Sequence, residues 1–233
     1  MFNFILRAWI ILVRPPHRSL QAKMQARFRA AISSLHKMKH NENVSNPSVG
    51  ILLMGSSTLR RMQTKKFVEA APPCAEALVR RCVINCAVDW SGTAELSDTL
   101  RLTGHAIPAA LVICYSGVND VDHLADECIL ENVREVVKVV RDKEMTQFDC
   151  FVYIGIIESN IQTNLGRSEH IAELNESIRC LMKDVPGVLF FDPNRRGMLS
   201  AEDYGIDGMH MNERGYTNFI RGLWTFIESA MEE

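Results

Sequence analysis

The sequence predicts an α/β protein built as a three-layer α/β/α sandwich around a five-stranded parallel sheet. Five short apolar runs, each bounded by polar, Gly or Pro residues, are typical of strands that are buried on both faces. The segments between them carry apolar residues at three- and four-residue spacing, as helices that cover a sheet do. Strands that alternate with helices are expected to run parallel, because a crossover helix returns the chain to the same edge of the sheet.

The predicted strands cover residues 49–54, 83–84, 109–114, 151–157 and 188–191. The predicted helices cover residues 20–39, 129–140 and 171–182, and the first of these is expected to pack on the domain that follows. The 233 residues suffice for one large domain or two small ones, and no internal repeat divides them. We therefore expect one domain over residues 20–233, preceded by a basic and apolar segment over residues 1–19.

The charge is unevenly distributed, although the formal net charge is only -2. Residues 1–41 contain eight Lys and Arg residues and no Asp or Glu, which leaves 18 basic against 28 acidic residues in the remainder. The apolar stretch 2–13 is interrupted by Arg7 and falls short of the roughly 20 residues of a membrane span, so no transmembrane helix is expected. Residues 1–19 fit three interpretations: a mitochondrial presequence, an anchor in peripheral contact with a membrane, or an ordinary start that leads into the first helix.

The composition argues against several classes of protein. With 47% hydrophobic and 23% charged residues, the chain is neither disordered nor collagen-like. The acidic remainder shows no basic residues interleaved with aromatic ones, so no nucleic-acid partner is expected. Seven cysteines, an odd number without a CxxC pair, favour a reducing compartment, and we expect an intracellular protein that is cytoplasmic or mitochondrial. The sequence indicates no oligomeric state.

Reactive side chains stand where ligands bind in an open parallel sheet, beyond the carboxyl ends of strands. After the first strand, a glycine turn leads to Ser57, a candidate nucleophile at the start of a helix. After the third strand, the amide of Asn119 can donate a hydrogen bond to developing negative charge. Late in the chain, Asp207 lies three residues before His210, close enough to orient an imidazole that deprotonates a serine. Together these residues predict a Ser-His-Asp triad with an oxyanion hole.

With these motifs the sequence resembles the SGNH or GDSL-type serine hydrolases. The segment 51–61, ILLMGSSTLRR, is similar to the first block of that family and puts Ser57 at the nucleophile position. The segment 117–120, GVND, matches the third block. The segment 207–216 matches the last block, in which Asp-x-x-His is followed by Asn and by Gly-Tyr. The resemblance spans residues 21–227 and implies the same three-layer fold.

The second block departs from the family pattern. In the family, a stretch similar to NxGxxGS follows the second strand, and its last glycine donates a backbone N–H to the oxyanion. Residues 85–92 read NCAVDWSG, so ungapped counting puts Trp90 at the glycine position, and a two-residue shift puts Gly92 there instead. The resemblance therefore implies an oxyanion hole made by the Ser57 N–H, the Asn119 side chain and a backbone N–H at Trp90.

The resemblance implies hydrolysis of a carboxylic acyl ester through an acyl-enzyme on Ser57, with no cofactor and no metal ion. The expected substrate is a small-molecule or lipid acyl ester, contacted by Ser56, Gly117 and Arg167 in addition to the triad. Two alternatives stay open. One is a catalytically inactive binding module of the same fold, in which Trp90 blocks the site. The other is a flavodoxin-like nucleotide or flavin binder that holds phosphate at the turn after the first strand.

Overall fold

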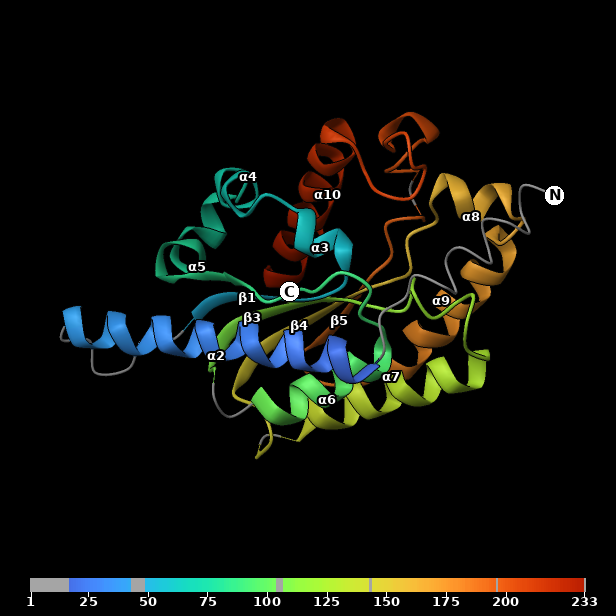
Figure 1. The fold of residues 1–233 in the computed structure, drawn as a ribbon. Helices are drawn as coiled ribbons and strands as arrows, with labels where there is room; N and C mark the ends of the chain where they lie inside the picture. Colours follow the sequence, from blue (N-terminus) through green and yellow to red (C-terminus); the bar gives the residue numbers. More distant parts are fainter. Residues whose placement is uncertain (1–16, 43–48, 104–106, 143, 196, 233) are drawn as a thin grey trace.

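The fold is described by a computed structural model over residues 17–42, 49–103, 107–142, 144–195 and 197–232. Within these residues, five strands form one parallel sheet in the order β2-β1-β3-β4-β5. The strands are β1 (Val49–Gly55), β2 (Val83–Asn85), β3 (Ala109–Tyr115), β4 (Phe148–Ile154) and β5 (Val188–Phe191). The predicted α/β class and the five-stranded parallel sheet are confirmed (Figure 1).

The central strands are apolar along their length because helices cover both faces of the sheet. All seven residues of β1 are buried, and six of the seven residues of β3 are buried. In the register of the sheet, Leu53 of β1 lies between Asn85 of β2 and Ile113 of β3. A strand in this position loses the alternation of polar and apolar residues that a half-exposed strand shows.

Helices pack on both faces of the sheet (Figure 1). One face is covered by α2 (His17–Glu42), α6 (Thr93–Thr103), α7 (Asp126–Arg141) and α9 (Ser168–Met182). The other face is covered by α3 (Ser57–Arg61), α4 (Thr64–Glu69), α5 (Glu76–Arg81) and α10 (Glu213–Met231). The short helix α8 (Asn160–Asn164) follows β4, and the 3-10 turns η1 (Pro73–Ala75) and η2 (Ala201–Asp203) lie in connections. Each face of the sheet thus has its own apolar cluster.

Helix α2 packs on the sheet domain, as the sequence predicts. Leu20 and Phe28 are buried, and the side chain of Gln21 donates a hydrogen bond to Asp98 of α6 over 3.4 Å. The helix begins at His17, so the boundary predicted between residues 19 and 20 falls within it. The rest of the predicted N-terminal segment, residues 1–16, lies outside the described residues. None of the described helices combines the length and the apolar character that crossing a membrane requires.

The fourth strand ends earlier than the apolar run predicts, at Ile154 instead of residue 157. The run continues because the loop after β4 is itself buried: Ile156 and Ile157 are almost inaccessible to solvent. The side chain of Asn175 on α9 accepts a hydrogen bond from the N–H of Ile156 over 2.7 Å and donates one to its carbonyl over 2.9 Å. The side chain of Asn175 thus forms the backbone hydrogen bonds that a neighbouring strand would otherwise provide, and this allows the loop to be buried.

The order of the strands fixes where a ligand site can form. The chain leaves β1 into α3 on one face of the sheet, and after β3 it continues to α7 on the other face. Two neighbouring strands whose connections diverge to opposite faces leave a crevice at their carboxyl ends, and ligands of flavodoxin-like sheets bind there. Ser57 follows β1 and Asn119 follows β3, so both stand at this crevice.

Candidate active site

Three side chains from distant parts of the chain meet beyond the end of β1. Ser57 begins α3, whereas Asp207 and His210 lie in the loop that precedes α10. Nε2 of His210 lies 3.1 Å from Oγ of Ser57, and Nδ1 of His210 lies 2.6 Å from Oδ2 of Asp207. Both distances are those of hydrogen bonds, so hydroxyl, imidazole and carboxylate form one connected chain.

Backbone hydrogen bonds shape the loop that carries Asp207 and His210. The N–H of Gly205 donates to the carbonyl of His210 over 2.8 Å, and the N–H of Gly208 donates to the carbonyl of Gly205 over 2.9 Å. Gly208 has a φ of +62°, a conformation that glycine adopts without strain. Oδ1 of Asp207 accepts the N–H groups of Met209 and His210 over 3.0 and 2.9 Å. One oxygen of Asp207 therefore holds the loop, and the other holds the imidazole.

The surroundings of Asp207 keep its carboxyl group ionised. Partial burial acts to raise the pKa of Asp207, but hydrogen bonds from the backbone N–H and ring of His210 and from the N–H of Met209 outweigh it, so that this pKa is lowered overall. An ionised carboxylate next to Nδ1 favours the tautomer with its proton on Nδ1. Nε2 then presents its lone pair to the Ser57 hydroxyl and can accept that proton.

A tight turn between β1 and α3 brings Ser57 to the crevice. Gly55 has a φ of +123°, and a Cβ at this position would lie 1.9 Å from the carbonyl oxygen of Tyr115, so only glycine fits. Ser56, which the sequence analysis placed among the substrate contacts, is completely buried beneath the turn, and its N–H donates to the Tyr115 carbonyl over 2.9 Å. The substrate therefore does not reach Ser56 in this conformation, whereas the hydroxyl of Ser57 faces His210.

The donors predicted for an oxyanion hole lie on neighbouring loops. Asn119 lines the same cleft as Ser57, and its Nδ2 donates to the carbonyl of Ser91 over 2.9 Å, which ties the loop after β3 to the loop after β2. Within the part of the chain that the structure describes, the backbone N–H groups of Ser57 and Trp90 have no hydrogen-bond acceptor. Both groups are therefore free donors, and of the two residues only Ser57 lines the cleft.

Trp90 occupies the position at which the resembling family has glycine, and its backbone keeps a glycine-like conformation. Its φ is +69°, and no other non-glycine residue among those described has a positive φ. The left-handed region is strained for a residue with a Cβ. The indole packs near Leu20 of α2 and Val88, and it is not among the residues that line the cleft at Ser57. The indole thus packs outside the cleft that contains the reacting hydroxyl.

Gly92, the other candidate for the oxyanion position, has a structural role in the loop after β2. Its N–H donates to Oε2 of Glu95 over 2.9 Å, and a Cβ at this position would lie 2.2 Å from Oδ1 of Asp120. Asp120, which is buried, accepts the N–H of Thr93 over 2.7 Å. The Asp of the GVND segment therefore holds the loop that carries Trp90 in place.

The cleft beside Ser57 is narrow, with a volume of about 20 Å³. Several residues that line it were not predicted from the sequence: Val118, Ile157, Ser159, Tyr204, Met209 and Met211. Tyr204 is fixed by a hydrogen bond from its hydroxyl to the carbonyl of Glu158 over 2.7 Å. The two methionines are the sequence neighbours of His210, so their place in the cleft could have been predicted from the sequence. No sequence pattern indicated that Tyr204 lines the cleft.

Two further predicted substrate contacts do not line this cleft. Arg167 forms an ion pair with Asp122, with 2.9 Å between Nη2 and Oδ1. Gly117 has a φ of +112°, and its carbonyl accepts the N–H of Asp120 over 2.9 Å, so it forms the turn that presents Asn119. Within the described ranges, no cluster of three or more His, Cys, Asp or Glu residues is arranged to hold a metal ion.

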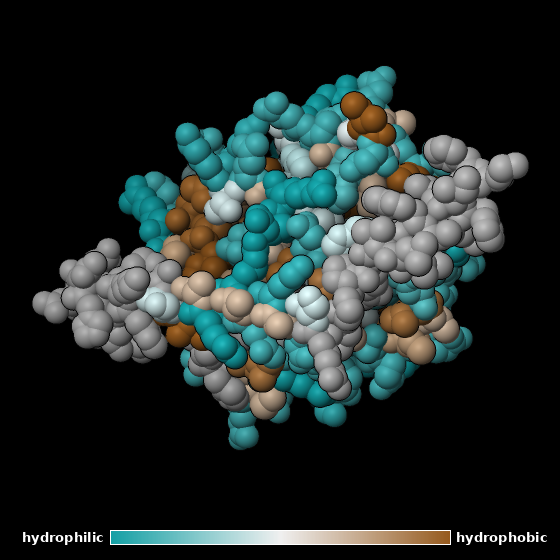
Figure 2. Space-filling view, in the orientation of Figure 1, coloured by the Kyte–Doolittle hydropathy of each residue, from teal (hydrophilic) through white to brown (hydrophobic). Residues whose placement is uncertain are grey.

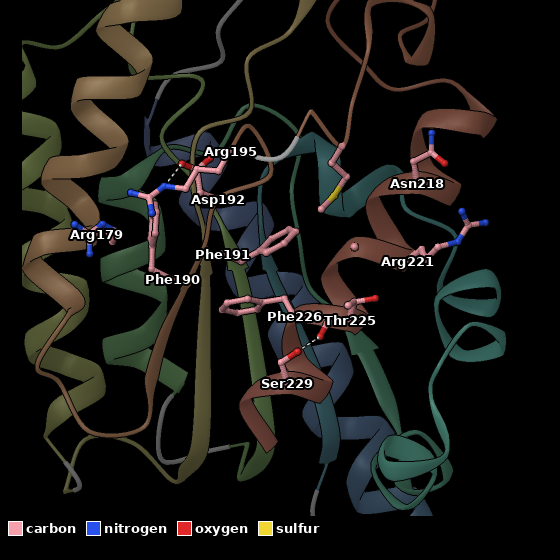
Figure 3. Close-up of a pocket in the computed structure, with 12 residues that line it drawn as sticks. Arg179, Phe190, Phe191, Asp192, Arg195, Asn218, Arg221, Thr225, Phe226 and Ser229 are labelled. Atoms are coloured by element: carbon pink, nitrogen blue, oxygen red, sulfur yellow. Dashed lines mark hydrogen bonds and ion pairs between the residues drawn. The ribbon is translucent and has the colours of Figure 1, made fainter. Parts of the chain in front are cut away.

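A larger pocket of about 600 Å³ lies along β5 and α10 (Figure 3). Three phenylalanine rings line it, those of Phe190, Phe191 and Phe226, and Nε of Arg195 lies 3.5 Å from Oδ2 of Asp192 at its margin. The pocket shares no lining residue with the cleft at Ser57. It is therefore separate from the site that holds the triad.

Solved structures resemble this chain, although no protein-family model and no curated protein sequence matches it. A putative platelet activating factor from Streptococcus pneumonia aligns at 19% identity over 95% of this chain and 96% of its own, with a TM-score of 0.64. A GDSL-like lipase from Bacteroides thetaiotaomicron aligns at 16% identity over 84% and 97%, with a TM-score of 0.58. A psychrotrophic esterase from Pseudoalteromonas sp. aligns at 14% identity over 79% and 100%, with a TM-score of 0.57. At such identities the likeness concerns architecture, and it shows that this chain has the fold of the SGNH or GDSL-like hydrolases.

Proposed function

We propose that the protein is a serine hydrolase that cleaves carboxylic esters with Ser57 as its nucleophile. The observation that carries this proposal is the hydrogen bond between His210 and Ser57, two residues 153 positions apart in the sequence. A serine that merely caps a helix does not need an imidazole at its hydroxyl, nor an ionised carboxylate behind that imidazole. The GDSL-like lipase, the psychrotrophic esterase and an aryl esterase from M. Smegmatis share the fold, which supports the same class.

In the first half of the proposed reaction, Ser57 Oγ attacks the ester carbonyl while Nε2 of His210 takes the hydroxyl proton. Asp207 stabilises the imidazolium that results, because its carboxylate stays ionised. The C–O bond to the alcohol then breaks, and the alcohol leaves with the proton from Nε2. In the second half, Nε2 of His210 takes a proton from water while the water oxygen attacks the acyl carbonyl. The C–O bond to Ser57 then breaks, the carboxylic acid is released, and Nε2 returns the proton to Oγ of Ser57.

The negative oxygen of each tetrahedral intermediate would accept hydrogen bonds from the N–H groups of Ser57 and Trp90 and from the side chain of Asn119. Donors fixed before the reaction are effective because no reorganisation is needed when the charge develops. The loop of Trp90 is fixed in this sense: it is held by Asn119 through Ser91 and by Asp120 through Thr93.

The inactive-module alternative requires Trp90 to block the site. The position of the indole argues against it, because the ring packs near Leu20 and Val88 outside the cleft at Ser57. The nucleotide-binding alternative is disfavoured by the hydroxyl of Ser57, which is engaged with His210. Neither alternative accounts for the carboxylate of Asp207 behind the imidazole.

The cleft at Ser57 favours esters of short acyl groups. Its volume of about 20 Å³ is close to that needed for a single water molecule, so a long acyl chain finds no preformed tunnel there. Met209 and Met211 line the cleft, and methionine side chains adapt their shape readily. We therefore expect acetyl esters to be cleaved faster than octanoyl esters.

The proposal is tested by the hydrolysis of 4-nitrophenyl acetate and 4-nitrophenyl octanoate. The variant Ser57→Ala should lose at least about 10³-fold in kcat, because removal of a triad nucleophile leaves only the residual effect of the oxyanion donors and of binding. The matched control is Ser56→Ala, since the Ser56 hydroxyl is buried and has no hydrogen-bond partner among the residues that the structure describes. The control should keep the wild-type rate. Hydrolysis by Ser57→Ala at the wild-type rate would contradict the proposal.

A further inference from the structure

A second cavity, which we call the basic pocket, opens between α2, α3 and the loop after β2. It has a volume of about 470 Å³ and is lined by Lys23, Ala26, Arg27, Arg60, Val88, Asp89 and Trp90. Three of these residues are cations and only one is an anion. Figure 2 shows hydrophilic side chains gathered on this face between α2 and α3.

The cations of the basic pocket have few partners within the protein. Nη1 of Arg27 donates to the carbonyl of Ala87 over 2.6 Å, which holds α2 against the loop of Trp90. Lys23 and Arg60 form no ion pair or hydrogen bond through their side chains with any residue in the described ranges. Burial and the positive charge of Arg60 lower the pKa of Arg27, although the charge of Asp89 acts to raise it.

The single carboxylate does not balance this charge. Oδ1 of Asp89 lies 4.0 Å from Nε of Arg61, a residue outside the lining of the pocket, and both side chains are about half exposed. Asp89 therefore shares its charge with a fourth cation. The basic pocket keeps a net positive charge, and a low-molecular-weight anion placed in it would gain attraction from Lys23, Arg27 and Arg60 together.

The basic pocket lies beside elements that carry the candidate active site, although the two cavities share no lining residue. Ser57 and Arg60 are three residues apart on α3, a spacing that puts side chains on the same side of a helix. On the other side, Trp90 lines the basic pocket, while the next residue, Ser91, accepts a hydrogen bond from Asn119 in the cleft. Arg60 and Trp90 thus connect the basic pocket to the helix and the loop beside the cleft.

We propose that the basic pocket binds an anionic group of the substrate, a carboxylate or a phosphate, and so selects esters that carry such a group near the scissile bond. Lys23 and Arg60 supply the free charges, and Arg27 both positions the loop and adds to the attraction. The proposal rests on the proposed hydrolase function and names its substrate class: anionic esters with a short acyl group.

Arginines also line the pocket along β5 (Figure 3). Arg179 and Arg195 both form ion pairs with Glu176, and Arg195 also lies near Asp192. These two charges are largely satisfied within the protein, whereas Arg221, which also lines this pocket, forms no ion pair with any of the described residues. Of the two pockets, only the basic pocket is lined by a residue of α3, the helix that begins at Ser57.

The test compares kcat/KM for two pairs of esters that differ in charge. In the first pair, 4-acetoxybenzoate and its neutral methyl ester place the anion on the leaving group. In the second pair, 4-nitrophenyl hemisuccinate and 4-nitrophenyl butyrate place it on the acyl group. For at least one pair, the ratio of anionic to neutral kcat/KM should fall about 3- to 10-fold in Lys23→Gln and in Arg60→Gln. The same ratio should fall in the wild type as salt is added, because salt screens exposed charges.

The matched control is Arg29→Gln, because Arg29 is exposed on α2 but does not line the basic pocket. This control should leave both ratios at their wild-type values. If neither ratio changes in Lys23→Gln or Arg60→Gln, or if Arg29→Gln lowers a ratio equally, the basic pocket does not select the substrate.

A binding measurement separates this inference from the proposed function. Phenyl phosphate should raise the Tm of the wild type more than that of the Lys23→Gln or Arg60→Gln variant, whether or not any ester is hydrolysed. If no ester is cleaved but this difference in Tm is found, the hydrolase proposal fails and anion binding stands. If esters are cleaved and phenyl phosphate raises the Tm of all three proteins equally, the anion-binding proposal fails alone.

Discussion

The left-handed backbone of Trp90 makes a prediction about stability that needs no knowledge of the substrate. We compare Trp90→Gly with Trp90→Ala, because both remove the indole and its packing near Leu20 and Val88. The φ of +69° costs a residue with a Cβ about 1–2 kcal/mol, a cost that glycine avoids. Against this, glycine loses about 0.4–1 kcal/mol relative to alanine through the larger entropy of its unfolded chain. Trp90→Gly should therefore be more stable than Trp90→Ala by about 0.5–1 kcal/mol.

The assay is urea-induced unfolding, with the free energy of unfolding obtained from the midpoint and slope of each transition. Arg221 provides the control pair, because it is exposed in the middle of α10 and has ordinary helical neighbours. There the order should reverse, with Arg221→Gly less stable than Arg221→Ala by about 1 kcal/mol. If Trp90→Ala proves as stable as Trp90→Gly or more stable, the backbone at this position is not left-handed in solution, and the described geometry of the oxyanion loop is wrong.

Three further predictions concern the cleft and its supports. Asn119→Ala should lower kcat for 4-nitrophenyl acetate about 10²- to 10³-fold, and a rate near that of the wild type would remove Asn119 from the oxyanion hole. Gly92→Ala should lower the free energy of unfolding by about 1–3 kcal/mol in urea, because its Cβ would meet Asp120 at 2.2 Å; an unchanged midpoint would contradict this packing. Since the pKa of Asp207 is lowered in the folded protein, its charge adds stability that is complete above the unfolded pKa of about 3.9 and is lost as the pH falls through the folded pKa. The stability difference between the wild type and Asp207→Asn should therefore shrink as the pH drops below about 4, and a difference that grows there would reverse the assigned shift.

The sheet could be predicted from the sequence because its strands are buried on both faces. β5 occupies the predicted residues 188–191, and the other strands overlap their predicted ranges. The predicted end of the fourth strand was wrong, because apolar residues there do not all belong to a strand. β4 ends at Ile154, and the apolar run continues into a buried loop, where the side chain of Asn175 forms hydrogen bonds with the backbone of Ile156. A run of apolar residues indicates that a segment is buried, but it does not by itself show that the segment pairs with another strand.

Helix α6 escaped prediction for a related reason. Only Leu96 and Leu100 give its inward face an apolar spacing, because Thr93, Ser97 and Thr99 are buried beside them. Some of their polar groups find partners that lie far away in the sequence: the hydroxyl of Thr93 accepts a hydrogen bond from Asn132 over 3.1 Å. Helix α10 was missed although Phe219, Leu223 and Ile227 recur every four residues, so in that case the signal was present in the sequence.

The candidate site was predictable where a motif fixes both residue type and place. Ser57, Asn119 and His210 stand at loops that the sheet order brings together, and the structure places all three around one cleft. The burial of Ser56 and the ion pair of Arg167 were not predictable, because each depends on a residue remote in the sequence, Tyr115 and Asp122 respectively. The basic pocket likewise combines α2, α3 and the loop after β2, which no local pattern connects.

The central claim is that Ser57 is a nucleophile activated by His210. It is tested most directly by treating the native protein with a fluorophosphonate, measuring the mass of the intact protein and locating the adduct by peptide mapping. The account predicts one adduct per chain, on the hydroxyl of Ser57, that is lost in Ser57→Ala and forms much more slowly in His210→Ala. An adduct on another residue, or one that forms equally fast without His210, would contradict it.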